Sequence, residues 1–247
     1  MARDLTQKKE QLPSVIDFAM DAADGLDNLT TQDMAIPFFS VLQKMSPQLD
    51  TLDGAKAGHI FNSVTEELFD TLTVIPCAYK REFVEWHPRE QGGGFVGTHS
   101  VDSDVVTKAT RTDVGLMTPN GTMLVETANH FVLAVTDKGI DRGLIAMTST
   151  QLKKNRRWNS LMSGLKLKDG NGKLYTPARY SHQYTLSSLV EKNDKGSWHG
   201  WVIEMAGQVQ DPELYALAKE FSNSVREGNV QTGQPNPEAA ADIGDTF

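Results

Sequence analysis

The sequence has 247 residues, a formal net charge of −8 at pH 7, and 39% hydrophobic and 23% charged residues. A chain of this length can bury a core of its own, and this composition is ordinary for a soluble globular protein. The single cysteine, Cys77, excludes an internal disulfide bond and any zinc site built from several cysteines.

Residues 1–30 form a polar and charged lead-in. One short amphipathic helix is predicted from Pro13 to Ala23, since Pro13 suits a first helical turn. The lead-in lacks the apolar core of a signal peptide, and no stretch of about eighteen consecutive apolar residues occurs in the sequence. We therefore expect a cytoplasmic protein that does not use a membrane.

Residues 31–71 are predicted to be a helical segment that docks on the main domain. Thr31 is a suitable helix cap, and the apolar residues that follow it recur at helical spacing up to Met45. Pro47 and the run from Asp50 to Gly58 end this helix.

Residues 72–226 are predicted to be the main domain, built from antiparallel strands. The segment Leu72–Trp86 is rich in β-branched and aromatic residues and predicts a long strand with Ile75, Cys77 and Tyr79 on one face. Pro76 must then lie at an edge or a bulge, because proline cannot donate a hydrogen bond to a neighbouring strand. Further strands are predicted over residues 122–136, 142–149, 180–189 and 198–206.

Two helices are predicted in this domain. The first follows the capping residues Thr148, Ser149 and Thr150 and runs to about Leu165. Its spacing places Trp158, Leu161 and Leu165 toward the core and its basic residues toward solvent. The second runs from Pro212 to about Arg226 and has an apolar stripe that packs on the strands.

The segment from Arg142 to Arg179 contains nine basic residues and a single acidic one, Asp169. An acidic protein that gathers its positive charge in one segment is typical of a protein that binds a polyanion. Aromatic residues lie within and just after this segment, and base stacking needs flat side chains beside cations. These are Trp158, Tyr175, Tyr180 and Tyr184. The alternative, a solvated basic helix on an acidic protein, stays open.

The residue patterns of common enzymes are missing. No two of the six histidines have the spacing of metal ligands on one element, and no phosphate-binding loop occurs. Glu66–Glu67 and the pair Asp102 and Asp104 could hold a metal in a nuclease, but solvated loop acids are the simpler interpretation. We therefore expect a protein that is not an enzyme and that uses no cofactor and no metal.

Residues 227–247 are predicted to be a disordered acidic tail. They contain no lysine or arginine and end in Phe247. An acidic segment next to a terminal aromatic residue is typical of a docking peptide, whereas a bare acidic tail is usually a solubilising appendage.

Taken together, a β-rich middle, a basic and aromatic surface and an acidic tail ending in phenylalanine resemble phage-type single-stranded DNA-binding proteins with an OB-fold. The resemblance rests on the strands from Leu72 to Ala206, Lys153–Arg157, Glu238–Phe247, Ile36–Gln43 and Phe69–Trp86. It implies an α+β, mainly β fold, with an OB-like antiparallel barrel and added helices. It also implies binding of single-stranded DNA in replication, recombination or repair, with the tail recruiting phage or host proteins.

This hypothesis assigns three groups of binding residues. The cations expected to contact phosphates are Lys80, Arg81, Lys153, Lys154, Arg156 and Arg157. The rings expected to stack on bases are Trp86, Tyr175, Tyr180, Tyr184 and Trp198. The tail residues expected to bind partners are Glu238, Asp242, Asp245 and Phe247.

Two other functions stay open at this point. One is a protein-interaction factor, an inhibitor or a scaffold, that binds a phage or host enzyme and in which the basic helix is merely structural. The other is a metal-dependent nuclease. The sequence also leaves the oligomeric state open, a homo-oligomer included, together with the role of residues 99–116.

Overall fold

A computed structural model of the chain describes residues 24–29, 33, 35–194 and 196–230. The chain divides into two compact units, Met1–Met34 and Ala35–Phe247. In the first unit the described residues form turns, one closed by a hydrogen bond from the Leu29 N–H to the Leu26 carbonyl. The predicted helix Pro13–Ala23 and the predicted tail beyond residue 230 lie outside the described residues.

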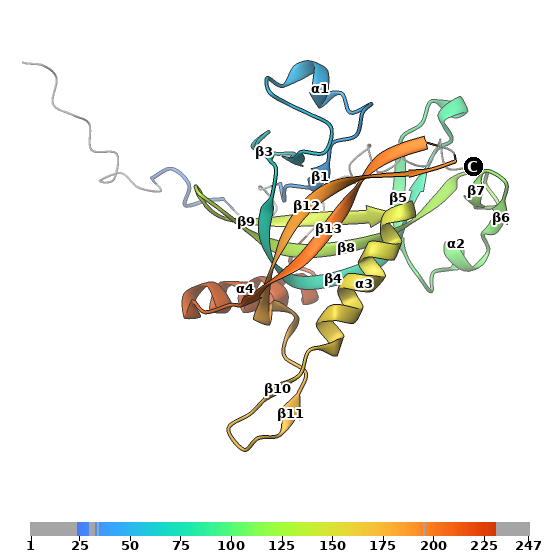
Figure 1. The fold of residues 1–247 in the computed structure, drawn as a ribbon. Helices are drawn as coiled ribbons and strands as arrows, with labels where there is room; N and C mark the ends of the chain where they lie inside the picture. Colours follow the sequence, from blue (N-terminus) through green and yellow to red (C-terminus); the bar gives the residue numbers. More distant parts are fainter. Residues whose placement is uncertain (1–23, 30–32, 34, 195, 231–247) are drawn as a thin grey trace, which may run out of the picture. The chain divides into compact units, whose positions relative to one another are not determined.

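The second unit contains one large antiparallel sheet and two smaller ones (Figure 1). The large sheet consists of β4 (Leu72–Trp86), β5 (Phe95–Ser100), β6 (Thr110–Thr112), β7 (Gly115–Met117), β8 (Met123–Thr136), β9 (Gly139–Thr148), β12 (His182–Asn193) and β13 (Gly196–Gln208). Its five long strands pair in the order β9-β8-β4-β12-β13. β5 pairs with the end of β4, and β7 and β6 continue the sheet from β8.

The smaller sheets and the helices lie around this sheet. The small sheets are β1 (Phe39–Val41) with β2 (Ile60–Asn62) and β3 (Leu68–Phe69), and β10 (Leu167–Lys168) with β11 (Leu174–Tyr175). The helices are α1 (Gln48–Thr51), α2 (Asp104–Thr107), α3 (Leu152–Gly164) and α4 (Pro212–Arg226), with single 3₁₀ turns η2 (Arg89–Gln91), η3 (Ser149–Gln151) and η4 (Arg179–Ser181). The predicted α+β, mainly β class is therefore confirmed, and β4 and α4 have the predicted bounds.

Of the two positions predicted for Pro76, an edge or a bulge, β4 has the bulge. Its register with β8 shifts between Pro76 and Ala78, so the proline needs no partner for an N–H that it lacks. The extra residue also changes which side chains share a face. Tyr79, predicted beside Ile75 and Cys77, packs instead against the opposite cluster, because a bulge inverts the alternation beyond it.

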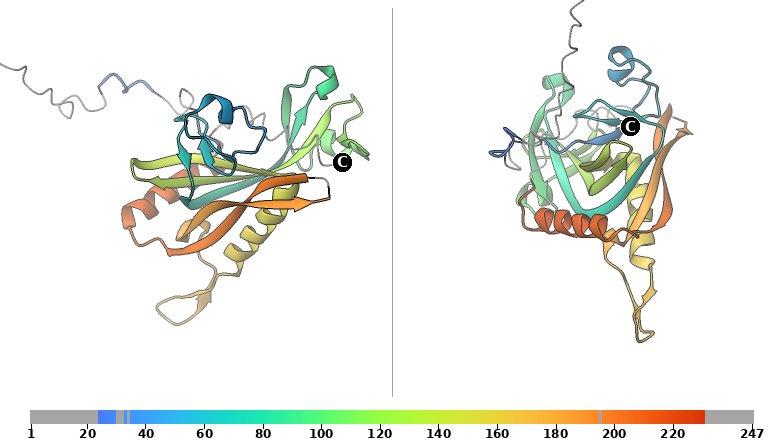
Figure 2. Two further views of the ribbon diagram at one scale, coloured as in Figure 1. Left: turned by 45° about the horizontal axis from the view of Figure 1, so that its top comes forward. Right: turned by 90° about the vertical axis from the view of Figure 1, so that its left-hand side faces the viewer.

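Two hydrophobic clusters lie on opposite faces of the sheet, since successive residues of β8 alternate between them. In the first, Trp158 and Met162 of α3 pack on the inner side chains of β4, β8, β9 and β12. In the second, Leu214, Ala218 and Phe221 of α4 pack on the outer side chains of β4, β8 and β9. Figure 2 shows α4 lying across the outside of the curved sheet. Asp211 caps α4 by accepting hydrogen bonds from its first N–H groups.

The helix predicted from Thr31 to Met45 is wrong for residues 35–45. Residues 39–41 form β1, and Phe38 bridges in parallel to Leu144 of β9. Pro37 lacks an N–H, disfavours helix in the residue before it and accepts a hydrogen bond from the Leu144 N–H. Pairing with β2 and β9 therefore overrides the helical spacing, and Met45, predicted to dock, is 91% exposed.

Residues 37–43 also connect β9 and β13, the first and last of the five paired strands. The Gln43 side chain donates to the His199 carbonyl of β13 at 3.0 Å and accepts from the His199 N–H at 2.8 Å. The Gln43 side-chain amide thus makes the hydrogen bonds to β13 that a neighbouring strand would make. At β9, the Pro37 carbonyl and the Phe38 bridge contact Leu144. Residues 37–43 therefore bridge the edge strands β9 and β13.

The close approach of this segment to β9 gives a test of the bridge. A Cβ added at Gly143 would lie 2.2 Å from the Phe39 ring and 3.3 Å from the Pro37 carbonyl oxygen. We expect Gly143→Ala to lower the free energy of unfolding by about 1–3 kcal/mol, measured by urea denaturation. The control is Gly164→Ala at the end of α3, where a Cβ has free space, so it should be neutral or stabilising by up to about 1 kcal/mol. Equal stability of the two variants would contradict the bridge.

Candidate nucleic-acid interface

The helix α3 has one buried side and one basic side. Asn155, Trp158 and Met162 are buried, whereas Leu161, predicted to face the core, is 38% exposed. The positions Lys153, Arg156 and Arg157 are related by i, i+3 and i+4 spacing and lie together on the exposed side. Because Trp158 fixes the buried side, this basic side must face solvent.

The exposed cations of α3 have no acidic partners. No ion pair in the described part of the chain involves Lys153, Arg156 or Arg157. The helix itself contains no acidic residue. Three neighbouring positive charges without a counter-charge repel one another and attract an anion.

Lys154, one helical turn before Arg157, differs from these three cations because it has an acidic partner. Its ammonium group pairs with Glu191 of β12, whose other carboxylate oxygen accepts a hydrogen bond from the Trp198 indole at 3.1 Å. Lys154 and the half-buried Trp198 ring are therefore held near each other, but the Lys154 charge is already neutralised.

The other predicted cations are also paired. The Lys80 ammonium lies 2.7 Å from Glu82, and the Arg81 guanidinium lies 2.8 Å from Glu126 on β8. Both side chains are exposed, so they remain reachable, yet their charge is compensated within the sheet. The structure does not bring them together with the uncompensated cations of α3 into one group of free charges.

Two of the five predicted stacking rings are buried, and the prediction is wrong for them. Trp86 packs edge-on against Phe95 in a small cluster with Val84, and Tyr184 is fully buried against Trp158. A ring in this position cannot offer a face to a base unless the core opens. Alternation along a strand predicts which side chains share a face but not which face is covered.

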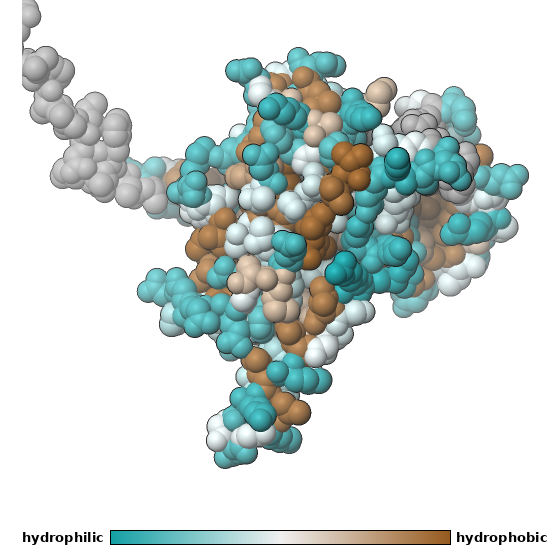
Figure 3. Space-filling view, in the orientation of Figure 1, coloured by the Kyte–Doolittle hydropathy of each residue, from teal (hydrophilic) through white to brown (hydrophobic). Residues whose placement is uncertain are grey.

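The strands β10 and β11 form a hairpin that extends α3 away from the sheet (Figure 1). Asp169 accepts hydrogen bonds from the N–H groups of Asn171 and Lys173, so its carboxylate is turned into the hairpin's own turn. The remaining charges are positive, at Lys166, Lys168 and Lys173. Figure 3 shows the hairpin standing clear of the surrounding surface, with a hydrophilic tip.

Three tyrosines lie at the foot of this hairpin. Tyr175 of β11 is 46% exposed, and Tyr180 of η4 contacts Tyr215 of α4 with ring centroids 5.2 Å apart. Tyr215 is 38% exposed and was not predicted as a site residue. It lies next to the buried Leu214, one position outside the apolar stripe of α4. In the sequence, the signal for an exposed ring at Tyr215 is that this aromatic residue stands beside the apolar stripe of α4 and not within it.

A buried polar network joins α3 to the sheet and η4. His130 of β8 stacks on Trp158 with centroids 4.4 Å apart and hydrogen-bonds Asn155 through Nε2 at 2.9 Å. Arg179 donates to His130 Nδ1 and to Asn159 Oδ1, both at 2.8 Å, and lies over the Tyr79 ring. Burial and the Arg179 charge lower the pKa of His130 to about 3, so its ring is neutral.

Arg179 itself has no carboxylate partner among the described residues. Burial lowers its pKa to about 10, which leaves the guanidinium charged at neutral pH. It therefore adds a fixed, uncompensated positive charge behind the exposed cations of α3.

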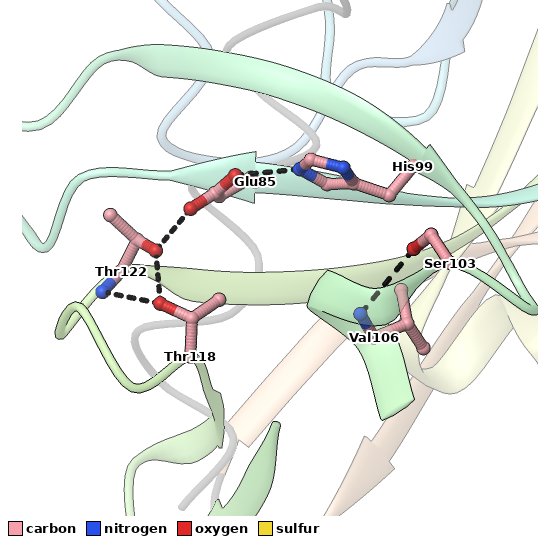
Figure 4. Close-up of polar contacts among 6 residues, drawn as sticks. All are labelled: Glu85, His99, Ser103, Val106, Thr118 and Thr122. Carbon is pink, nitrogen blue, oxygen red and sulfur yellow. Dashed lines mark hydrogen bonds and ion pairs between the residues drawn. The ribbon is translucent and has the colours of Figure 1, made fainter. Parts of the chain in front are cut away.

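A second polar cluster lies at the end of β4 (Figure 4). Glu85 accepts hydrogen bonds from Thr122 and from His99, whose Nε2 lies 2.6 Å from its carboxylate, and Thr118 contacts Thr122. Burial raises the pKa of Glu85, but these hydrogen bonds outweigh it and hold the pKa below its usual value. The carboxylate lies between hydroxyl and imidazole, so the histidine is not placed to take a proton from the threonine.

This cluster explains the segment 99–116, whose role the sequence left open. The hydrogen bonds of Glu85 fasten β5 and the turn after β7 to the end of β4. Ser103 caps the short α2 between them by accepting from the Val106 N–H. The segment is thus a structural extension of the sheet.

Among the described residues, no group of histidine, cysteine and acidic side chains could hold a metal ion. None of the helices in that part of the chain is long and apolar enough to cross a membrane.

The family model described as "Pam3 phage gp34-like protein" matches residues 6–231, which is most of the chain. No curated protein and no solved structure matches the chain.

The neutral, buried His130 makes the fold sensitive to acid. Because the pKa of His130 is lowered from 6.5 to about 3, the unfolded chain binds a proton in this range while the folded chain does not. The free energy of unfolding should therefore keep its full value above pH 6.5. Below pH 6.5 the His130 contribution should lower it by about 1.4 kcal/mol for each pH unit, down to about pH 3. In His130→Gln, urea denaturation at a series of pH values should show a smaller slope. An unchanged slope would show that His130 is not held neutral.

Proposed function

The chain belongs to the family of Pam3 phage gp34-like proteins, and from that premise we propose that it is a phage protein that binds single-stranded DNA. It works in the host cytoplasm and acts by binding rather than by catalysis. The observation that carries this proposal is the basic side of α3. In a protein with a net charge of −8, Lys153, Arg156 and Arg157 lie exposed, adjacent and without acidic partners among the described residues.

A merely solvated helix would not need this arrangement. Surface cations in an acidic protein lower the free energy when they lie near carboxylates, as Lys80, Arg81 and Lys154 do here. Leaving three charges of α3 and Arg179 without carboxylate partners, beside a hairpin whose three lysines outnumber its single acid, costs free energy that an anionic ligand would offset. A nucleic-acid backbone supplies such charges at regular intervals.

The order of the strands also supports the proposal. If β4, β8, β9, β12 and β13 are counted as strands one to five, their spatial order is 3-2-1-4-5, with α3 between the third and fourth. An OB barrel has this order and this helix, with strands three and five closing the barrel. Here residues 37–43 bridge these two strands. OB barrels are frequent carriers of single-stranded nucleic-acid binding, although fold alone does not establish function.

A protein-interaction factor that ignores DNA would need the same charges for an acidic protein partner. Exposed rings beside the cations favour the nucleic acid, since Tyr175 and the half-buried Trp198 can stack on bases. A labelled oligothymidylate separates the two functions directly. Degradation of that oligonucleotide with added divalent metal would instead indicate a nuclease.

The first test removes the basic side of α3. For about four to six phosphate contacts, the log–log dependence of affinity on salt should have a slope of roughly −3 to −4. The triple variant Lys153→Gln, Arg156→Gln, Arg157→Gln should bind more weakly at low salt, and its slope should be smaller by about 2. Fluorescence anisotropy of a labelled oligothymidylate measures both. Indole emission is a poor reporter, because Trp86, Trp158 and Trp201 are buried.

A control matched in charge removes three lysines that are exposed elsewhere, two of which, Lys108 and Lys138, are paired with carboxylates; the third is Lys56. The triple change of these to Gln alters the net charge equally but should leave the salt slope near that of the unchanged protein. If both triple variants lose the same affinity, net charge rather than the α3 surface controls binding.

The proposal also assigns a role to the acidic residues of the tail. Glu238, Asp242 and Asp245 compete for the basic surface in the free protein. DNA displaces them, and Phe247 is then free to bind a replication, recombination or repair protein of the phage or host.

Deletion of residues 238–247 should therefore tighten binding of the oligothymidylate at low salt and have little effect at high salt, where charge competition is screened. Anisotropy titrations at the two salt concentrations measure the difference. Replacing the three acids by Asn or Gln while keeping Phe247 should tighten DNA binding to a similar extent. Unchanged affinity at low salt in both variants would rule out competition by the tail.

A further inference from the structure

The face that an OB barrel ordinarily offers to oligonucleotides is covered in this protein. That face is formed by strands two and three, here β8 and β9. Phe131 and Leu144 on the outer side of these strands pack in one cluster with Leu214, Ala218 and Phe221 of α4. Arg142 of β9 is also paired with Glu220 of α4 at 3.1 Å. A strand of DNA therefore needs another place for its bases.

The foot of the hairpin offers exposed rings instead. Tyr180 and Tyr215 meet with their ring planes inclined by 63°, an edge-to-face contact that leaves ring surface uncovered. Burial and the neighbouring Tyr180 raise the pKa of Tyr215, and Tyr175 is close enough to act on it electrostatically. Tyr215 of α4 thus meets Tyr180 of η4 and lies within electrostatic range of Tyr175 of β11, although Tyr215 is distant from both in the sequence.

The turn η4 explains why Tyr180 points to this place. Its first residue, Arg179, is held inward by His130 and Asn159. The next residue is then directed toward α4, where it meets Tyr215. The backbone behind the turn is fixed by a hydrogen bond from the Val209 N–H to the Ser181 carbonyl at 2.9 Å. The ring of Tyr180 is therefore positioned before any ligand binds.

Cations border the three rings. Lys173 precedes the exposed Leu174 and Tyr175 on the hairpin, and Lys219 lies one helical turn beyond Tyr215 and acts on it electrostatically. Two acids precede Tyr215 on α4: the exposed Glu213 lies two positions before it and therefore on a different side of the helix, and Asp211 is turned toward the N–H groups that it caps. Rings bordered by cations are the arrangement that binds bases and phosphates of a single strand.

From this geometry we infer that Tyr175, Tyr180 and Tyr215 form a base-stacking site at the foot of the hairpin. The inference rests on the proposed function and deepens it. The DNA strand runs along the basic side of α3, passes the foot of the β10–β11 hairpin and reaches the start of α4. Tyr215 is thereby a nucleic-acid-binding residue, and the outer face of β8 and β9 takes no part.

Tyr215 is the position that tests this most cleanly. It is exposed, it lies outside the apolar stripe of α4, and alanine favours helix, so Tyr215→Ala should fold normally. Loss of one stacking ring should weaken binding of an oligothymidylate about 5- to 140-fold. Tyr215→Phe keeps the ring and should bind like the unchanged protein. Leu189→Ala, an exposed apolar residue on β12, is the matched control and should have no effect.

A second ligand separates stacking from charge. A strand of the same length with abasic sugar-phosphate units has the phosphates but no bases, so Tyr215→Ala should bind it as the unchanged protein does. Equal weakening with both strands would overturn the stacking site, as would full affinity of Tyr215→Ala for the oligothymidylate. If the unchanged protein binds neither strand, the proposed function itself fails.

Discussion

The structure depends on the way in which α3 is anchored. Trp158 lies fully buried inside the sheet, stacked on His130, and the buried polar network of Asn155, Asn159 and Arg179 fixes the rotation of the helix about its axis. Because this side of α3 is fixed against the sheet, the cations on the opposite side of the helix are exposed to solvent. The exposed, unpaired charge of α3 is therefore a consequence of core packing, and under the proposed function it is in place before the DNA binds.

The second helix has the complementary effect. By packing on the outer side of β4, β8 and β9, α4 removes this face of the sheet from solvent. The same helix brings Tyr215 beside Tyr180. It therefore covers the outer face of the sheet and also supplies one ring of the tyrosine pair at the foot of the hairpin. Under the proposed function, the DNA therefore binds along α3 and the β10–β11 hairpin and not on the outer face of β8 and β9.

The sequence predicted those parts of the fold that local pattern determines. β4 was found from its β-branched and aromatic residues, its bulge from Pro76, and α4 from its apolar stripe and Pro212. The segment 35–45 was not, because its conformation is set by pairing with β2 and β9, partners distant in the sequence. Among the candidate site residues, charge density indicated α3 correctly as an exposed basic helix. Burial of Trp86 and Tyr184, and the meeting of Tyr215 with Tyr180, depend on the packing of separate elements, which no single stretch of sequence contains.

Amide hydrogen exchange with and without an oligothymidylate tests most directly where the DNA lies, since it reports every segment at once. We predict that added oligonucleotide slows exchange in α3, in the β10–β11 hairpin and in the first turn of α4, and leaves β8 and β9 unchanged. Protection confined to β8 and β9, or no protection anywhere at low salt, would contradict binding along the helix and hairpin.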